Sequence, residues 1–268
     1  MCVAVLALGV LLAAGSAQAA TLPTLTLALT KTSITVAGTT QSGAVNVVST
    51  ATGVKEANAI LFQLRPGVTV EELETALKNG AGNEPNKATK YGSIVFDAEI
   101  APGQSNETQT ELAPGQYVAL AGEGEGSPKF KAAFTVTAAA SPATLPAPQA
   151  TIRSIEFGFR GPTTLHDGEL VRFEDEGFLV HMDVAFPAKS KADAKLIVKG
   201  LLTGKEKGLE KLVAGEPFSF QGPVSHEAFQ QETITAKPGW YVQACFMTTQ
   251  DGRSHTRLGM ERIIKIVK

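Results

Sequence analysis

Short runs in which apolar and polar residues alternate make up most of the chain, and they predict β-strands. The runs are rich in β-branched residues and are bounded by Gly, Pro, Asn and Ser, as strands are. In the first half the predicted strands are residues 33–36, 44–48, 92–96 and 131–136. In the second half they are residues 152–159, 170–174, 182–186, 231–236, 240–247 and 262–267.

Two segments have a helical period instead. Residues 70–77 carry apolar residues at helical spacing, and so do residues 190–213, where Gly200 and Gly204 interrupt the pattern. Many short strands with one helical insertion in each half predict an all-β fold with short helical insertions. We expect two tandem β-sandwich domains of Greek-key type.

The boundary between the two domains is predicted by composition. Residues 138–149 are rich in Ala and Pro and carry no charge, which is typical of a semi-stiff linker. They separate a domain at residues 21–137 from one at residues 150–268. Five residues of the first half recur 124 positions later, which indicates a duplicated domain: Gly53, Pro114, Gly115, Tyr117 and Val118 correspond to Gly177, Pro238, Gly239, Tyr241 and Val242.

The first twenty residues predict a secretory signal peptide. An apolar stretch at residues 3–14 is followed by Ala17-Gln18-Ala19, a typical cleavage signal, and it is too short to span a bilayer. Cleavage would remove Cys2 and leave no transmembrane segment. We therefore expect an extracytoplasmic protein, either secreted or periplasmic.

Charge and cysteine content narrow the candidate functions. The net charge of −2 and the pI near 6.1 provide no basic face, so nucleic acid is not an expected partner. Without Cys2, Cys245 is the single cysteine and forms no intramolecular disulfide. The sequence gives no indication of an oligomeric state.

A set of soft metal donors lies near the end of the chain. Cys245, His255 and Met260 follow one another before the last predicted strand, and His181 lies upstream. A thiolate, two imidazoles and a weak axial thioether suit a mononuclear copper ion in both of its oxidation states. Each residue also has a purely structural interpretation: a buried core cysteine, a strand-edge or solvated histidine, and a packing methionine.

The second domain resembles the cupredoxins, the plastocyanin- and azurin-like blue copper proteins. The resemblance rests on residues 171–177 before His181 and on the order Pro238-Gly239-Trp240-Tyr241, Cys245, His255 and Gly259-Met260. It implies that Cys245 is the thiolate ligand, that His181 and His255 are the equatorial imidazoles, and that Met260 is the axial ligand.

The sequence departs from the cupredoxin pattern in two places. Nine residues separate Cys245 from His255, a gap longer than the family's usual loop, which an Asp251-Gly252 turn could fold back. Asp175 stands where cupredoxins often have an asparagine that supports the cysteine. Met247 is a spare soft ligand if the register differs.

Two further histidines and the equivalent positions of the first domain supply no predicted metal ligands. His166 and His226 lie in polar connections and are predicted to be surface residues. At the offset of 124, the first domain has Ala57 in place of His181 and Ala121 in place of Cys245, so we predict a cupredoxin-like domain without metal ligands.

These observations lead to three hypotheses. The first is an exported protein that binds one type 1-like copper ion for electron transfer or copper binding, with a redox partner protein and no enzymatic activity. The alternative is a metal-free, two-domain β-sandwich protein for interaction or surface binding. A third is an accessory protein that delivers copper through a more exposed site.

Overall fold

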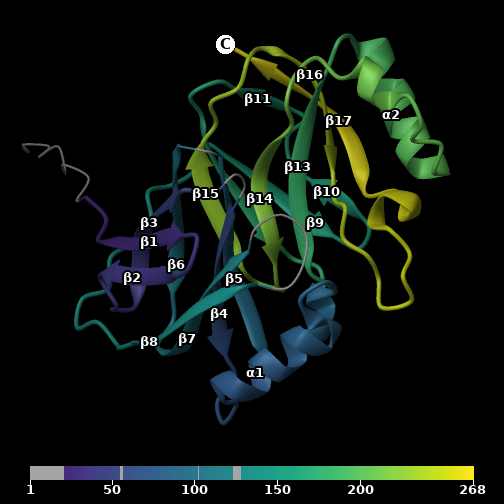
Figure 1. Cartoon of the computed structure of the whole chain (residues 1–268). Coiled ribbons are helices and arrows are strands. Elements are labelled where there is room, and N and C mark those ends of the chain that lie inside the picture. Colours follow the sequence, from purple (N-terminus) through teal and green to yellow (C-terminus); the bar gives the residue numbers. More distant parts are fainter. Residues whose placement is uncertain (1–20, 55–56, 102, 123–127) are drawn as a thin grey trace, which may run out of the picture.

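The structure is a computed structural model that describes residues 21–54, 57–101, 103–122 and 128–268 (Figure 1). The predicted signal peptide, residues 1–20, lies outside the described residues. The fold is all-β with short helices, as the sequence predicts. Within the described ranges, no helix combines the length and the apolar character needed to cross a bilayer.

Among its described residues, the first half contains eight strands and one helical insertion. Its strands are β1 (Thr24–Thr30), β2 (Ile34–Gly38), β3 (Gly43–Thr52), β4 (Ala57–Leu64), β5 (Gly92–Ile100), β6 (Ser105–Leu112), β7 (Gly115–Gly122) and β8 (Phe130–Val136). The insertion between β4 and β5 comprises α1 (Val70–Ala76), a π turn η1 (Leu77–Ala81) and a 3₁₀ turn η2 (Pro85–Lys87).

The second half contains nine strands. They are β9 (Ala150–Ile155), β10 (Gly158–Arg160), β11 (Thr164–His166), β12 (Leu170–Asp175), β13 (His181–Ala188), β14 (Phe218–Val224), β15 (Phe229–Thr233), β16 (Gly239–Ala244) and β17 (Glu261–Val267). Its helices are α2 (Lys191–Thr203) and the 3₁₀ turns η3 (Leu209–Leu212) and η4 (His255–Leu258).

Both halves have the same strand order. In the first half, the order β5-β4-β7-β8 forms one sheet, and β6-β3-β1-β2 belongs to the other. In the second half, β14-β13-β16-β17 and β15-β12-β9-β10 repeat these orders, with β11 added beside β17. The parallel pairing of β1 with β3 recurs in the pairing of β9 with β12. Each half packs its apolar faces between its two sheets.

The two halves are joined through a sheet. Strands β6 and β15 pair antiparallel at Gln109 and Gln231, which makes one eight-stranded sheet out of two four-stranded ones. The side chain of Gln231 donates to Gln109 Oε1 at 2.8 Å and to the carbonyl of Pro146, in the predicted linker, at 3.1 Å. The chain between the halves therefore lies against the shared sheet.

The repeated Pro-Gly-x-Tyr segments have the same local structure. The hydroxyl of Tyr117 donates to the carbonyl of Ala113 at 3.0 Å, and that of Tyr241 donates to the carbonyl of Lys237 at 2.8 Å. Each tyrosine thus fixes the turn four residues before it, where the chain enters β7 or β16. The repeated sequence therefore forms the same hydrogen bond from a tyrosine hydroxyl to a turn carbonyl in both halves.

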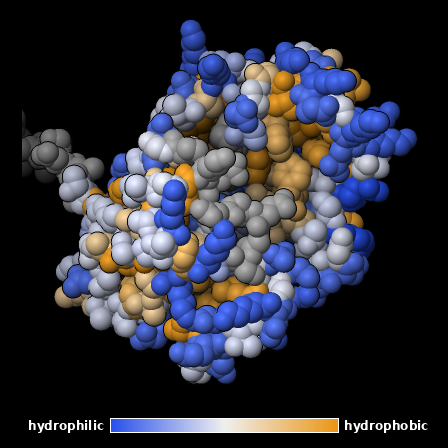
Figure 2. Space-filling view, viewed as in Figure 1, coloured by the Kyte–Doolittle hydropathy of each residue, from blue (hydrophilic) through white to orange (hydrophobic). Residues whose placement is uncertain are grey.

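The helical predictions hold with corrected limits. Thr69 and Glu72 form a reciprocal capping box that starts α1. The predicted segment 190–213 is not one helix: α2 stops at Gly204, which adopts a left-handed φ of 65°, and η3 follows after a turn. A pocket next to α2 is lined by apolar side chains that include Ile197 and Phe246, and Figure 2 shows hydrophobic side chains gathered beside α2.

The strand predictions needed more correction. Six strands were not predicted, β1, β4, β6, β7, β11 and β14, and the predicted strand 152–159 is a hairpin of β9 and β10. Strand β6 is polar in sequence, yet Thr108 and Thr110 are buried and Thr110 donates to the carbonyl of Phe229 of the other half. Its buried face is polar because it meets the second half rather than an apolar core.

Candidate metal centre

The sheet of the second half brings the predicted ligands to one edge. His181 is the first residue of β13, Cys245 follows the last residue of β16, and Met260 precedes β17. Strand β16 lies between β13 and β17 and is antiparallel to both. The start of β13, the end of β16 and the start of β17 therefore meet at the same edge.

The long segment between Cys245 and His255 folds back on itself. The amide of Thr249 donates to the carbonyl of Arg253 at 2.9 Å, and Gly252 takes a left-handed φ of 81° in the turn between them. The amide of His255 then donates to the carbonyl of Met247 at 2.8 Å. Seven of the nine intervening residues thus form a closed hairpin, and His255 returns to the end of β16.

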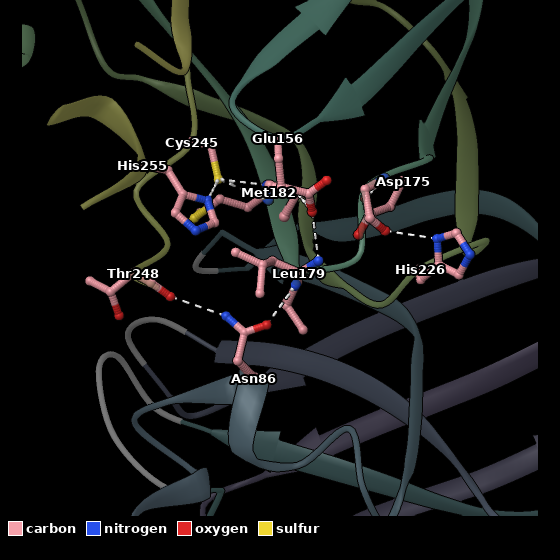
Figure 3. Close-up of polar contacts among 12 residues, drawn as sticks. Asn86, Glu156, Asp175, Leu179, Met182, His226, Cys245, Thr248 and His255 are labelled. Atoms are coloured by element: carbon pink, nitrogen blue, oxygen red, sulfur yellow. Dashed lines mark hydrogen bonds and ion pairs between the residues drawn. The ribbon is translucent and has the colours of Figure 1, made fainter. Parts of the chain in front are cut away.

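Three donor atoms converge. Cys245 Sγ lies 3.3 Å from His255 Nδ1 and 3.8 Å from His181 Nδ1, and one donor atom from each residue lies within 4.8 Å of the others (Figure 3). The two imidazole rings are tilted by 54° with centroids 4.9 Å apart. An ion about 2.3 Å from a sulfur and about 2.0 Å from a nitrogen separates those atoms by about 3.5 Å at a tetrahedral angle, so the donor set fits one metal ion.

Met260 is buried in the same region. Its amide donates to the carbonyl of His255 at 3.0 Å, and its carbonyl accepts from the amide of Cys245 at 3.1 Å. Gly259 permits this close approach with a left-handed φ of 98°. The Met260 side chain belongs to the same hydrophobic cluster as Cys245 and Met247, so the structure keeps both methionines close to the thiol.

Burial sets the protonation states of the donors. Cys245 and His255 are fully inaccessible and His181 is only 1% exposed. Burial raises the pKa of the Cys245 thiol to about 12, although the amide of Met182 donates to its sulfur. Burial lowers the pKa of His255 to about 4, and it also lowers the pKa of His181, where the nearby Glu156 carboxylate opposes the shift. Both imidazoles are neutral near pH 7, the form that binds a metal.

Glu156 orients His181, a role that no sequence pattern indicates. Its Oε1 lies 3.3 Å from His181 Nε2 and accepts the amide of Leu179 at 2.7 Å. When His181 Nε2 carries the proton and donates to this carboxylate, the lone pair of Nδ1 points towards Cys245. The next residue, Phe157, packs edge-on against His255 with ring centroids 4.9 Å apart.

One buried polar atom of the site lacks a partner. Among the described residues, none accepts or donates a hydrogen bond at His255 Nε2, although this atom is inaccessible. Burying a ring nitrogen without a hydrogen bond costs free energy. The other ring nitrogen of His255, Nδ1, is the one that faces the thiol.

The remaining candidates lie apart from this cluster. His166 is exposed beside Glu169, and His226 is exposed with its Nδ1 2.7 Å from the carbonyl of Gly177, as predicted for surface residues. Asp175 does not reach the cysteine: its Oδ1 accepts the amide of Gly177 at 2.9 Å, two residues along its own loop. Burial raises the pKa of Asp175 to about 8.

No protein-family model matches the sequence, and no curated protein does. Solved structures do match. Reduced auracyanin from the photosynthetic bacterium Roseiflexus castenholzii is 14% identical, covering 44% of this chain and 95% of its own, with a TM-score of 0.27. Auracyanin A, a "blue" copper protein from Chloroflexus aurantiacus, is 20% identical, covering 44% of this chain and 98% of its own, with a TM-score of 0.25. The copper-containing nitrite reductase of Thermus scotoductus is 12% identical, covering 91% of this chain and 68% of its own, with a TM-score of 0.27.

At identities of 12–20%, these matches concern the fold alone. One prediction is corrected. From the sequence we expect no enzymatic activity, but the neighbours include nitrite reductases and a multicopper oxidase, which are enzymes. The expectation that the chain is not an enzyme is therefore withdrawn.

Proposed function

We propose that the chain binds one copper ion in a type 1-like site and uses it to transfer single electrons. The ligands would be His181, Cys245, His255 and Met260. The observation that carries the proposal is the buried convergence of the Cys245 thiol on the Nδ1 atoms of both histidines. Copper bound there would supply a one-electron Cu(II)/Cu(I) couple with a thiolate ligand.

The chain's own residues support this use. Glu156 holds the imidazole of His181, and the hairpin before His255 holds the backbone of His255, by hydrogen bonds that do not involve the metal. The amide of Met182 donates to the sulfur of Cys245, which stabilises a thiolate. Three of the ligands lie at strand ends of a packed sandwich and His255 begins the 3₁₀ turn η4, so their positions are held in the same way in either oxidation state.

Burial favours electron transfer over copper delivery. A site that hands its metal to another protein needs ligands that a partner can reach, whereas Cys245, His255 and Met260 are inaccessible and His181 is 1% exposed. Export to the periplasm or cell exterior remains part of the proposal and rests on the apolar segment at residues 3–14. A redox partner protein is likewise proposed.

The test is to add one equivalent of Cu(II) to the metal-free, reduced protein and record the visible spectrum. We expect an intense thiolate-to-copper charge-transfer band that is absent in Cys245→Ser. Met247→Leu is the matched control, because it replaces a buried neighbour of the thiol by a side chain of similar volume. No band in the unchanged protein would reject the copper site and favour the metal-free interaction protein.

A further inference from the structure

The edge that carries the ligands is covered by the first half. Leu73, Leu77 and Ala88 of the helical insertion belong to one hydrophobic cluster with Cys245 and Met260 of the second half. In Figure 1 this insertion lies below the lower ends of the second half's strands. The two halves thus share a core at the candidate metal centre, in addition to the sheet that joins them.

One polar side chain of the insertion reaches both ligand loops. Asn86, in η2, accepts the amide of Val180 at its Oδ1 with a distance of 2.8 Å. Its Nδ2 donates to the carbonyl of Thr248 at 3.1 Å (Figure 3). Val180 immediately precedes His181, and Thr248 lies between Cys245 and His255. A single amide therefore bridges the loop that ends at His181 and the loop that leads from Cys245 to His255.

The side-chain amide of Asn86 matches the chemistry of both contacts. The amide of Val180 can only donate and the carbonyl of Thr248 can only accept, so the bridging group must offer one acceptor and one donor in a fixed plane. Asn86 is 8% exposed, so water does not readily replace either bond. Its own position is fixed, because Pro85 begins the 3₁₀ turn and the hydroxyl of Thr89 donates to the carbonyl of Asn86 at 2.9 Å.

We propose that Asn86 is a positioning residue of the metal centre, and that the first half completes the site by clamping its two ligand loops together. This inference rests on the proposed function, since it assigns the clamp to the copper ligands. It also gives the domain without ligands a specific role.

The experiment compares Asn86→Leu with Thr110→Val in a Cys2→Ser background, where Cys245 is the only thiol. Asn86→Leu keeps the volume and removes both bonds of the clamp. Thr110→Val removes another buried bond between the halves, from Thr110 to the carbonyl of Phe229, that involves neither ligand loop. Two quantities are measured: the rate at which a disulfide reagent labels Cys245 in the metal-free protein, and the affinity for Cu(II) by chelator competition.

We expect labelling at least about tenfold faster in Asn86→Leu, because loop opening exposes the thiol, and copper affinity lower by about 10–100-fold. Thr110→Val should leave the labelling rate and the copper affinity close to those of the unchanged protein. Asn86→Asp, which keeps the acceptor for Val180 and loses the donor to Thr248, should also label faster and provides a second comparison if the leucine variant does not fold.

Equal labelling rates and affinities in the Asn86 and Thr110 variants would overturn the clamp. The two proposals fail separately. If the unchanged protein shows the copper band and the Asn86 variants match it, the clamp is wrong and the copper site stands. If the unchanged protein takes up no copper while Asn86→Leu still labels faster, the loops are clamped but the copper function is wrong.

Discussion

The two halves share a strand order but differ at one edge. In the first half, the positions equivalent to His181 and Cys245 hold Ala57, at the start of β4, and Ala121, in β7, and both are buried. The chain then runs from Ala121 to Phe130 of β8 through a segment without His or Met, whereas the second half inserts a closed hairpin, His255 and Met260 before β17. The same scaffold therefore forms with and without the candidate donors, and the second half differs from the first at this edge by two side chains and a longer loop.

The largest expected effect comes from making the second half like the first. His181→Ala combined with Cys245→Ala reproduces Ala57 and Ala121. We expect copper affinity to fall more than about a thousandfold, since two of the four donors are lost, while the β-rich circular dichroism spectrum stays the same. Chelator competition and circular dichroism measure the two effects. Loss of the fold in the metal-free double variant would show that the second scaffold depends on its ligand residues.

The next effect tests which methionine belongs to the site. Met260→Leu should raise the reduction potential by about 50 mV or more, close to the 59 mV of a tenfold change for one electron. The physical reason is that losing an electron-donating thioether destabilises Cu(II) more than Cu(I). Met247→Leu, also buried beside the thiol, should change the potential much less. Redox titration of both variants measures these shifts in reduction potential. A larger shift for Met247→Leu than for Met260→Leu would assign Met247 as the axial ligand.

A third prediction concerns pH and the contact between the halves. Asp97 of β5 is buried against Gly222 of β14, and desolvation raises its pKa to about 7 from an ordinary 3.8. Between pH 4 and 7 the unfolded chain ionises this carboxyl while the folded protein keeps its proton. Stability therefore falls as pH rises through this range and levels off above pH 7.

Urea unfolding at pH 5 and pH 8 measures this dependence. Between pH 5 and pH 8 the free energy of unfolding should fall by roughly 2–3 kcal/mol less in Asp97→Asn than in the unchanged protein. A residual slope is expected, because burial also raises the pKa of Asp183 to about 7 and of Glu232 to about 8. Identical slopes for the variant and the unchanged protein would show that Asp97 ionises freely in the folded state.

The smallest effect concerns the feature that both halves share. Tyr117→Phe and Tyr241→Phe each remove the hydroxyl that bonds the turn four residues earlier. Each should cost about 1 kcal/mol in the free energy of unfolding, and neither should change the copper spectrum. Urea titrations and visible spectra check this, and a spectral change in Tyr241→Phe would mean that its turn contributes to the geometry of Cys245.

Several features were predicted from the sequence because they depend on local signals. The Pro-Gly-x-Tyr repeat marked two equivalent turns, the helical period marked α1, and the Asp251-Gly252 turn indicated how His255 could return to Cys245. Strands β4 and β6 were missed because neither shows a clean alternation. Strand β4 is apolar on nearly every residue, and β6 presents threonines to the other half.

By itself, the sequence determined the β-rich class, the duplication and the order of four soft donors, since periodicity, repeated turns and residue chemistry are properties of short segments. Only the tertiary structure decided that β6 and β15 join the halves, that Glu156 faces His181, and that Asn86 bridges Val180 and Thr248. Asn86 lies 94 positions from Val180 and 162 from Thr248. No local pattern encodes contacts over such separations, because they exist only once two independently packed sandwiches have met.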